Sequence, residues 1–239
     1  MNNIKLIAMD LDGTLTQHRT PLSAECEATL RHLSEKYKLL MVGAGTCRRI
    51  FEQMRHFPID IIGNYGLQIA LYDAALSDIR IVLDEQLPCD RESVSKRAAS
   101  IREKYGFTEY KGDPVEFHAS GCVTLPILGT KADITDKLAF DPTRERRRAI
   151  YPEVCDLFSE YTVFVGGSSS FDMAPHPYNK AYALARYCEE RGIAHSEVVF
   201  IGDDYGTGGN DESVYKSDFN FFKIDNYLDF SKIVAPLLD

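Results

Sequence analysis

The feature that most constrains the fold is a short apolar run near the N-terminus that ends in two carboxylates. Residues 4–9 read IKLIAM, and the loop that follows begins DLDGT, so Asp10 and Asp12 flank a single leucine. A short, continuously apolar run is typical of a strand buried on both faces, as in a parallel sheet. Functional residues of such sheets lie at the carboxyl ends of the strands. We therefore predict that Asp10 and Asp12 belong to an active site.

Strand and helix patterns alternate through the first third of the chain and again after residue 177. The apolar strand patterns fall at 39–43, 60–63, 198–202 and 219–224, and the helical patterns at 23–37, 48–56 and 179–191. Strands that alternate with helices pair in parallel through right-handed crossovers. The predicted fold class is therefore α/β, with a Rossmann-like, doubly wound parallel sheet.

The middle of the chain has a different rhythm. A helical pattern at 91–105 is followed by two neighbouring β-like runs, VEFHA and CVTLPIL, and after a charged helix by two more, TVFVG and SSFDMAP. Helices that alternate with hairpins indicate an α+β unit. We predict a cap domain at 84–176, inserted into a discontinuous catalytic core made of 1–83 and 177–239.

Two acidic clusters follow strands of the predicted sheet. Asp10 and Asp12 end the first strand, and Asp203 and Asp211 lie in the sequence GDDYGTGGND after the strand at 198–202. In such a set one carboxylate attacks phosphorus while a neighbouring carboxylic acid protonates the leaving oxygen. Hard oxygen ligands from two strand ends also suit Mg²⁺, which offsets the repulsion between a carboxylate and a phosphate dianion. The pattern predicts phosphoryl transfer at an Mg²⁺ site.

Two further positions are suited to an anionic group. Lys180 opens the helical pattern at 179–191, where its ammonium would bind a phosphoryl oxygen. The loop GAGT after the second strand has small residues that let backbone N–H groups approach an anion, and Thr46 adds a hydroxyl. We expect both positions to bind the phosphoryl group.

In this order and spacing, DLDGT, a small-residue loop, a lysine that opens a late helix and GDD…ND resemble the four motifs of the haloacid dehalogenase (HAD) superfamily. The inserted unit resembles the type IIB, Cof-like cap of sugar-phosphate phosphatases. Within that group the chain is most similar to eukaryotic-type phosphomannomutases. The segments that carry this likeness are DLDGTLTQHR, EFHASGCVTLPILG, GGSSSFDMAPHPYNKAYAL and FIGDDYGTGGNDESVY.

The resemblance implies a role for each matching residue. Asp10 would be the nucleophile and an Mg²⁺ ligand, Asp12 the acid/base and a metal ligand through its carbonyl, and Lys180 the phosphoryl binder. Asp203 would be a metal ligand, and Asp211 would lie in or near the same metal shell. The substrate-binding residues implied by the resemblance are Arg19, Ser170 and Asp172.

Three positions depart from the family pattern. In phosphomannomutases the cap hairpin reads E-F-R and ends in P-I-G-R, and those arginines grip the phosphate that is not transferred. Here His118 holds the first place, and Thr130 followed by Lys131 holds the second. Without arginine the fixed bidentate fork is lost, so His118 and Lys131 are expected to bind substrate more weakly. An ungapped match also puts Gly45 at the family's second-motif serine, with Thr46 one residue later, and both stay candidates.

A mutase must hold a bisphosphorylated intermediate and keep water from the aspartyl phosphate, so a weak distal clamp favours hydrolysis. We therefore predict an Mg²⁺-dependent phosphatase that acts on a small phosphorylated metabolite, a sugar phosphate, through an aspartyl phosphate. One alternative is a phosphomannomutase-like phosphohexose mutase. The other is a ligand-binding protein that keeps the HAD fold without turnover. The physiological substrate is not predicted.

Charge and hydropathy narrow the partners and the location. Lys and Arg total 27 against 36 Asp and Glu, a net charge of -9, which disfavours nucleic acid and anionic membrane as partners. No apolar stretch approaches the roughly 18 residues of a membrane span, and the N-terminal run is too short for a signal peptide. We expect a cytoplasmic protein.

The arginine-rich run at 144–148 is expected to form a solvated helix face. Mutase-type relatives commonly dimerise through the cap, so the resemblance makes a homodimer one candidate, while the sequence leaves the oligomeric state open.

Overall fold

The computed structural model describes residues 3–238, and the chain divides into two compact units. The first, called the core below, contains residues up to 85, 179–206 and those from 211 onwards; the second, the cap, contains 86–178 and 207–210. The segment 207–210 was not predicted to belong to the cap. It does so because Val165 N–H donates to Gly208 O at 2.8 Å and Arg148 Nε–H donates to Thr207 O at 3.2 Å.

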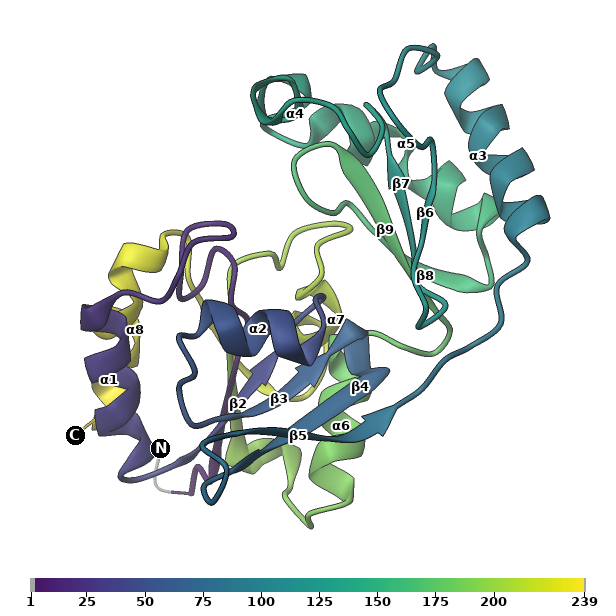
Figure 1. The fold of residues 1–239 in the computed structure, drawn as a ribbon. Coiled ribbons are helices and arrows are strands. Elements are labelled where there is room, and N and C mark those ends of the chain that lie inside the picture. The colour runs from purple at the N-terminus through teal and green to yellow at the C-terminus, as the bar shows by residue number, and fades with distance from the viewer. Residues whose placement is uncertain (1–2, 239) are drawn as a thin grey trace. The chain divides into compact units, whose positions relative to one another are not determined.

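The core is built on a seven-stranded sheet with the order β11-β10-β1-β2-β3-β4-β5. Figure 1 labels β2 to β5 of this sheet. From β11 to β3 neighbouring strands are parallel. These strands are β1 (Leu6–Met9), β2 (Lys38–Val42), β3 (Asp60–Gly63), β10 (Val198–Gly202) and β11 (Asn220–Lys223). The predicted Rossmann-like α/β fold is confirmed.

An antiparallel hairpin extends the sheet beyond β3, and the sequence prediction missed it. A short 3-10 turn, η1 (Asn64–Gly66), follows β3 and leads into β4 (Gln68–Asp73) and β5 (Asp78–Asp84), which are joined by a tight turn. Ile81 and Val82 of β5 are exposed because β5 is the edge strand. Arg80 interrupts the apolar pattern of β5, and the short apolar run of β4, residues 69–72, was not recognised as a strand.

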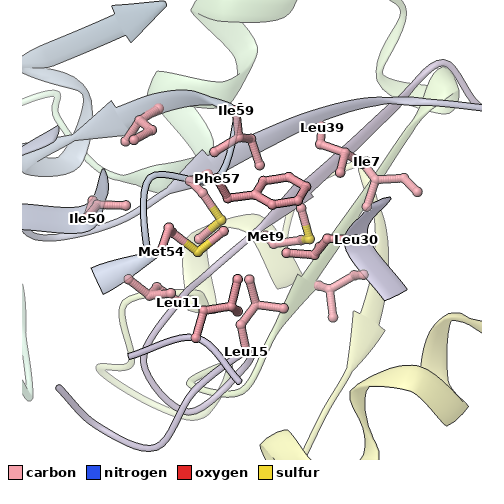
Figure 2. Packing of buried hydrophobic residues seen from close by; sticks show 14 of the residues in the cluster. Ile7, Met9, Leu11, Leu15, Leu30, Leu39, Ile50, Met54, Phe57 and Ile59 are labelled. Carbon is pink, nitrogen blue, oxygen red and sulfur yellow. The ribbon is translucent and has the colours of Figure 1, made fainter. Parts of the chain in front are cut away.

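Helices cover both faces of the core sheet because successive side chains of each strand point to opposite sides. Ile7 and Met9 of β1 pack with α1 (Ala24–Ser34), α2 (Cys47–Gln53) and α8 (Phe230–Leu238), in the cluster that Figure 2 shows. Leu6 and Ala8 face the other way, toward α6 (Lys180–Glu189) and α7 (Glu212–Tyr215). Two further 3-10 turns are η2 (His195–Glu197) and η3 (Tyr227–Asp229). The apolar layers fix the strands whose carboxyl ends carry the predicted site.

The cap is a four-stranded antiparallel sheet packed against helices. Its strand order is β6 (Glu116–Phe117), β7 (Val123–Pro126), β9 (Ser170–Pro175) and β8 (Tyr161–Phe164), and its helices are α3 (Arg91–Lys104), α4 (Ile134–Phe140) and α5 (Glu145–Leu157). Val123 and Met173 face the apolar cluster built by α3 and α5. Thr124 and Asp172 alternate with them and therefore lie on the opposite face of the sheet.

The arginine-rich run at 144–148 is not simply a solvated face, as the sequence analysis expected. Arg147 is fully buried in the cap, where its Nε donates to Asp141 Oδ2 at 2.9 Å and its Nη1 donates to Ser170 O at 2.9 Å. A charged side chain is tolerated inside a protein when its charge is paired and its donors are satisfied. Between residues 3 and 238 the structure contains no helix with the length and apolarity of a membrane span.

Candidate active site

The loop after β1 is locked to the loop after β10. Asp10 N–H donates to Ile201 O at 3.0 Å, which starts the loop against the neighbouring strand. Gly13 has a φ of +96°, and a Cβ there would lie 2.3 Å from a carboxylate oxygen of Asp203, so only glycine fits this turn. Thr14 Oγ1 donates to Asp203 Oδ1 at 2.9 Å. The two predicted acidic clusters are therefore held side by side.

Lys180 links these clusters from the start of α6. The Asn179 side chain caps the helix by accepting from Tyr182 N–H at 2.9 Å, which fixes where the helix begins. Lys180 is fully buried, and its Nζ lies 2.7 Å from Asp10 Oδ1 and 2.7 Å from Asp211 Oδ1. The ammonium thus joins the predicted nucleophile to the second acidic cluster.

Three of the four predicted metal ligands come together in the core. Ligand oxygens of Asp10, Asp203 and Asp211 all lie within 4.8 Å of one another. Asp211 is oriented by Asp204 N–H, which donates to its Oδ2 at 3.1 Å. The Asp12 carboxylate is not part of this group, which leaves the backbone carbonyl as the route by which Asp12 would bind a metal. Three clustered carboxylates form the hard-oxygen donor set that suits Mg²⁺.

The electrostatics of the cluster fit a cation of this kind. Burial is the main reason why the pKa of Asp10 lies well above its ordinary value; Asp211 and Asp203 add to the shift, and Lys180 opposes it. Burial, together with Asp211, also raises the pKa of Asp203 to about 6. Burial alone would lower the pKa of Lys180, but Asp10 and Asp211 hold it above the usual range. A divalent cation among these carboxylates would favour their ionised forms.

Asp12 has a separate set of partners in the core. Its Oδ1 accepts from Gln53 Nε2 at 2.6 Å and from the Arg19 backbone N–H at 2.7 Å, while Oδ2 lies 3.5 Å from Arg49 Nη1. Burial would raise the pKa of Asp12, but the hydrogen bonds from Gln53 and Arg19 lower it below the ordinary value. Arg19 is exposed, and the hydrogen bond to Asp12 comes from its main chain. That the Arg19 guanidinium binds substrate stays a prediction.

The loop after β2 gives its two candidate residues different environments. Thr46 is exposed, and its hydroxyl caps α2 by accepting from Arg49 N–H at 3.3 Å. Gly45 lies under the Arg49 side chain, because a Cβ at Gly45 would come within 2.3 Å of Arg49 Nε. The hydroxyl of Thr46 therefore has a helix-capping role in the structure. That it also binds phosphate stays a prediction.

The predicted substrate residues of the cap fall into two separate places. His118 Nε2 lies 3.1 Å from Thr124 Oγ1, which donates to Asp172 Oδ1 at 3.0 Å, and Ser170 Oγ lies 3.5 Å from the same oxygen. We call His118, Thr124, Ser170 and Asp172 the cap polar row. Burial raises the pKa of Asp172 above its ordinary value.

Lys131 does not belong to the cap polar row. Its backbone N–H donates to Lys111 O at 2.9 Å, and the residue is exposed. This position is at the open end of the β6–β7 hairpin, whereas His118 is at the turn, residues 118–121. The structure therefore does not bring His118 and Lys131 together. Both were predicted to take the places of family arginines. A role for either in binding substrate stays a prediction.

Sequence reasoning missed three side chains that shape the core site: Thr14, Arg49 and Gln53. Thr14 stands in the first motif, so its place next to two carboxylates was a usable signal. Gln53 lies seven residues after Thr46 at the end of α2, and its contact with Asp12 depends on how α2 packs. No pattern in the sequence marks a contact of that kind.

A known protein family and several of its members match this sequence. The family model described as eukaryotic phosphomannomutase matches residues 104–234, which is more than half of the chain. The chain belongs to this family. Phosphomannomutase from Triticum aestivum is 24% identical to it over 89% of this chain and 86% of that protein. Phosphomannomutase from Saccharomyces cerevisiae is 26% identical over 88% of this chain and 84% of that protein.

Solved structures share the fold. An IMP-bound, N-terminally truncated IMP-nucleotidase of Plasmodium falciparum matches with a TM-score of 0.73 and 13% identity, covering 97% of this chain and 67% of that chain. A HAD-superfamily phosphatase of Bacteroides thetaiotaomicron matches with a TM-score of 0.62 and 16% identity, covering 97% and 93%. The core of this phosphomannomutase-family chain therefore has the HAD fold.

Proposed function

We propose that this chain is a phosphohexose mutase of the phosphomannomutase type, which moves a phosphoryl group between two hydroxyls of a hexose through an aspartyl phosphate on Asp10. The observation that carries the proposal is the buried cluster of Asp10, Lys180, Asp203 and Asp211 in a chain of the phosphomannomutase family. Family membership favours the mutase. The sequence analysis had favoured the phosphatase, because the family arginines of the cap hairpin are replaced here.

The residues of the core support two linked steps. Asp10 would attack phosphorus and break the bond to the sugar oxygen, which takes a proton from Asp12. A different sugar hydroxyl would then attack the aspartyl phosphate, lose its proton to Asp12 and release Asp10. Gln53 and the Arg19 N–H hold the Asp12 carboxylate in one orientation for both transfers. Because its pKa is lowered, Asp12 favours its ionised form, which is the form that accepts the proton in the second step.

Mg²⁺ is the cofactor that we propose, held by Asp10, Asp203 and Asp211 with the carbonyl of Asp12. When bound, it would neutralise charge on the phosphoryl oxygens and orient the group for in-line transfer. Lys180, held between Asp10 and Asp211, would donate to a phosphoryl oxygen.

Hydrolysis is the second candidate, and the cap polar row favours it. His118, Thr124 and Asp172 contact one another and offer no arginine fork for a second phosphate. Lys131 lies at the other end of the hairpin. Without a firm hold on a bisphosphate, water would replace the sugar hydroxyl in the second step and release inorganic phosphate.

The deciding experiment follows both products in one reaction. Hexose 1-phosphates are supplied with Mg²⁺ and a small amount of hexose bisphosphate, and hexose 6-phosphate and inorganic phosphate are measured together. Isomerisation that is stimulated by bisphosphate and outpaces phosphate release is the result expected of a mutase. Phosphate release without isomerisation would replace the mutase with the phosphatase. Asp10→Asn, which should remove both activities, is the control for a contaminating enzyme.

A further inference from the structure

The loop after β2 has no side chain at position 45. In an ungapped match Gly45 takes the place of the phosphomannomutase second-motif serine, and the hydroxyl of the neighbouring Thr46 caps α2. The main chain of the loop is fixed, because Gly45 O accepts from Asn64 N–H at 2.8 Å. A Cβ on Gly63 would lie 2.7 Å from that same oxygen, so the loop also packs closely on the end of β3.

The guanidinium of Arg49 occupies the space that a residue-45 side chain would take. A Cβ on Gly45 would lie 2.3 Å from both Nε and Nη2 of Arg49 and 2.6 Å from its Cζ. All three contacts are far below normal van der Waals distances, so the guanidinium lies directly on the glycine. The absence of a side chain at 45 is therefore what allows the Arg49 side chain to enter this position.

The contacts of Arg49 leave two donor nitrogens available. Nη1 donates to Gln53 Oε1 at 2.9 Å and lies 3.5 Å from Asp12 Oδ2, a loose ion pair. Within residues 3–238 neither Nε nor Nη2 has a hydrogen-bond acceptor, and the side chain is 42% exposed. An arginine that served only to position Asp12 would be expected to donate a short hydrogen bond to that carboxylate.

We propose that Arg49 binds the transferring phosphoryl group in place of the missing hydroxyl, by donating from Nε and Nη2 to its oxygens. The inference rests on the proposed function, since it assigns a further binding residue to the same phosphoryl site. Guanidinium is well suited to the task because its planar array of donors matches two oxygens of one phosphoryl group. The site thereby exchanges a neutral donor for a charged one.

The test measures binding of inorganic orthovanadate, a phosphate mimic, to the full chain with Mg²⁺, by calorimetry and thermal shift. Arg49→Ala should weaken vanadate binding roughly 10- to 100-fold, because a charge-assisted hydrogen bond is lost. Arg48→Ala is the matched control: Arg48 is the next residue in α2, but it pairs with Asp78 on β5 at 2.7 Å. That variant should bind vanadate as the unchanged protein does.

A second variant tests the exchange of side chains directly. Gly45→Ser combined with Arg49→Ala restores a hydroxyl where the guanidinium lay, and should bind vanadate more tightly than Arg49→Ala alone. If Arg49→Ala binds vanadate as well as Arg48→Ala does, the inference is wrong although the phosphoryl site stands. If the unchanged protein binds no vanadate with Mg²⁺, the proposed phosphoryl site fails and the inference fails with it.

Discussion

The core site and the cap polar row use charged residues in opposite ways. In the core, Lys180 is buried between Asp10 and Asp211, and ligand oxygens of Asp10, Asp203 and Asp211 lie within 4.8 Å of one another. In the cap, the buried Arg147 donates its hydrogen bonds to Asp141 and to main-chain carbonyls. The polar row that remains consists of an imidazole, hydroxyls and one carboxylate.

This difference separates the chemistry from the choice of substrate. A phosphoryl-transfer site needs its charges fixed before the substrate arrives, which the core achieves by burial and pairing. Hydroxyl groups of a sugar need donors and acceptors more than net charge. The comparison predicts that changes to core charges remove activity, whereas changes to the row alter selectivity.

The largest expected effect comes from Lys180→Met. The change leaves Asp10 and Asp211 buried together without their shared cation, which should destabilise the core by about 3–5 kcal/mol and abolish phosphoryl transfer. Urea denaturation followed by circular dichroism measures the loss. Lys96→Met is the matched control, since Lys96 forms an exposed ion pair on α3. Equal stability of the two variants would show that the buried pairing does not support the core.

A smaller loss of stability is expected from Arg147→Leu in the cap. Leucine leaves Asp141 buried without its ion pair and the Ser170 carbonyl without its donor, at a cost of about 3 kcal/mol. Arg146→Leu, at an exposed position in the same helix, should change stability by less than about 1 kcal/mol. Thermal melts of the two variants are compared. If they melt together, Arg147 does not hold the cap as described.

The smallest expected effect is that of Asp172→Asn. Because burial raises the pKa of Asp172, its carboxyl stabilises the fold fully below the pKa of the unfolded chain and loses this contribution as pH rises through the folded pKa. Asparagine stays neutral and keeps the acceptor for Thr124. The variant should therefore melt about 1–3 °C higher than the unchanged protein at pH 8 and equally at about pH 4.

The same substitution also tests whether Asp172 contributes to activity. If Asp172 binds sugar hydroxyls, Asp172→Asn should lower kcat/KM roughly 10-fold through loss of a charge-assisted hydrogen bond. Vanadate binding, which reports on the core site, should stay the same. A loss of vanadate binding would contradict the separation between the core site and the cap polar row.

Much of the core was predictable because its signals are local. The apolar runs of β1 and β10 end directly at Asp10 and Asp203, and α6 begins at Lys180 after its cap residue. Strand ends of a parallel sheet meet at one edge, so the order of these motifs already indicated one site. The spacing of apolar residues likewise predicted α3 to within a residue at its C-terminal end.

The rest depends on packing that no local pattern encodes. The exposure of Ile81 and Val82 on β5 follows from the place of β5 at the edge of the sheet. Arg147 sits in a run of arginines, and only the position of Asp141 selects it for burial. The position of Arg49 over Gly45 follows from how α2 meets the loop before it. In each case, contacts with residues distant in the sequence decide where a side chain lies.

The most direct test of the account is to look for the covalent intermediate. The protein is mixed with Mg²⁺ and hexose bisphosphate, quenched in acid and digested, and the peptides are weighed by mass spectrometry. One added phosphoryl group is expected on the peptide that contains Asp10, and none on that peptide from Asp10→Asn. A phosphoryl group on a different residue, or none in a protein that still turns over, would contradict it.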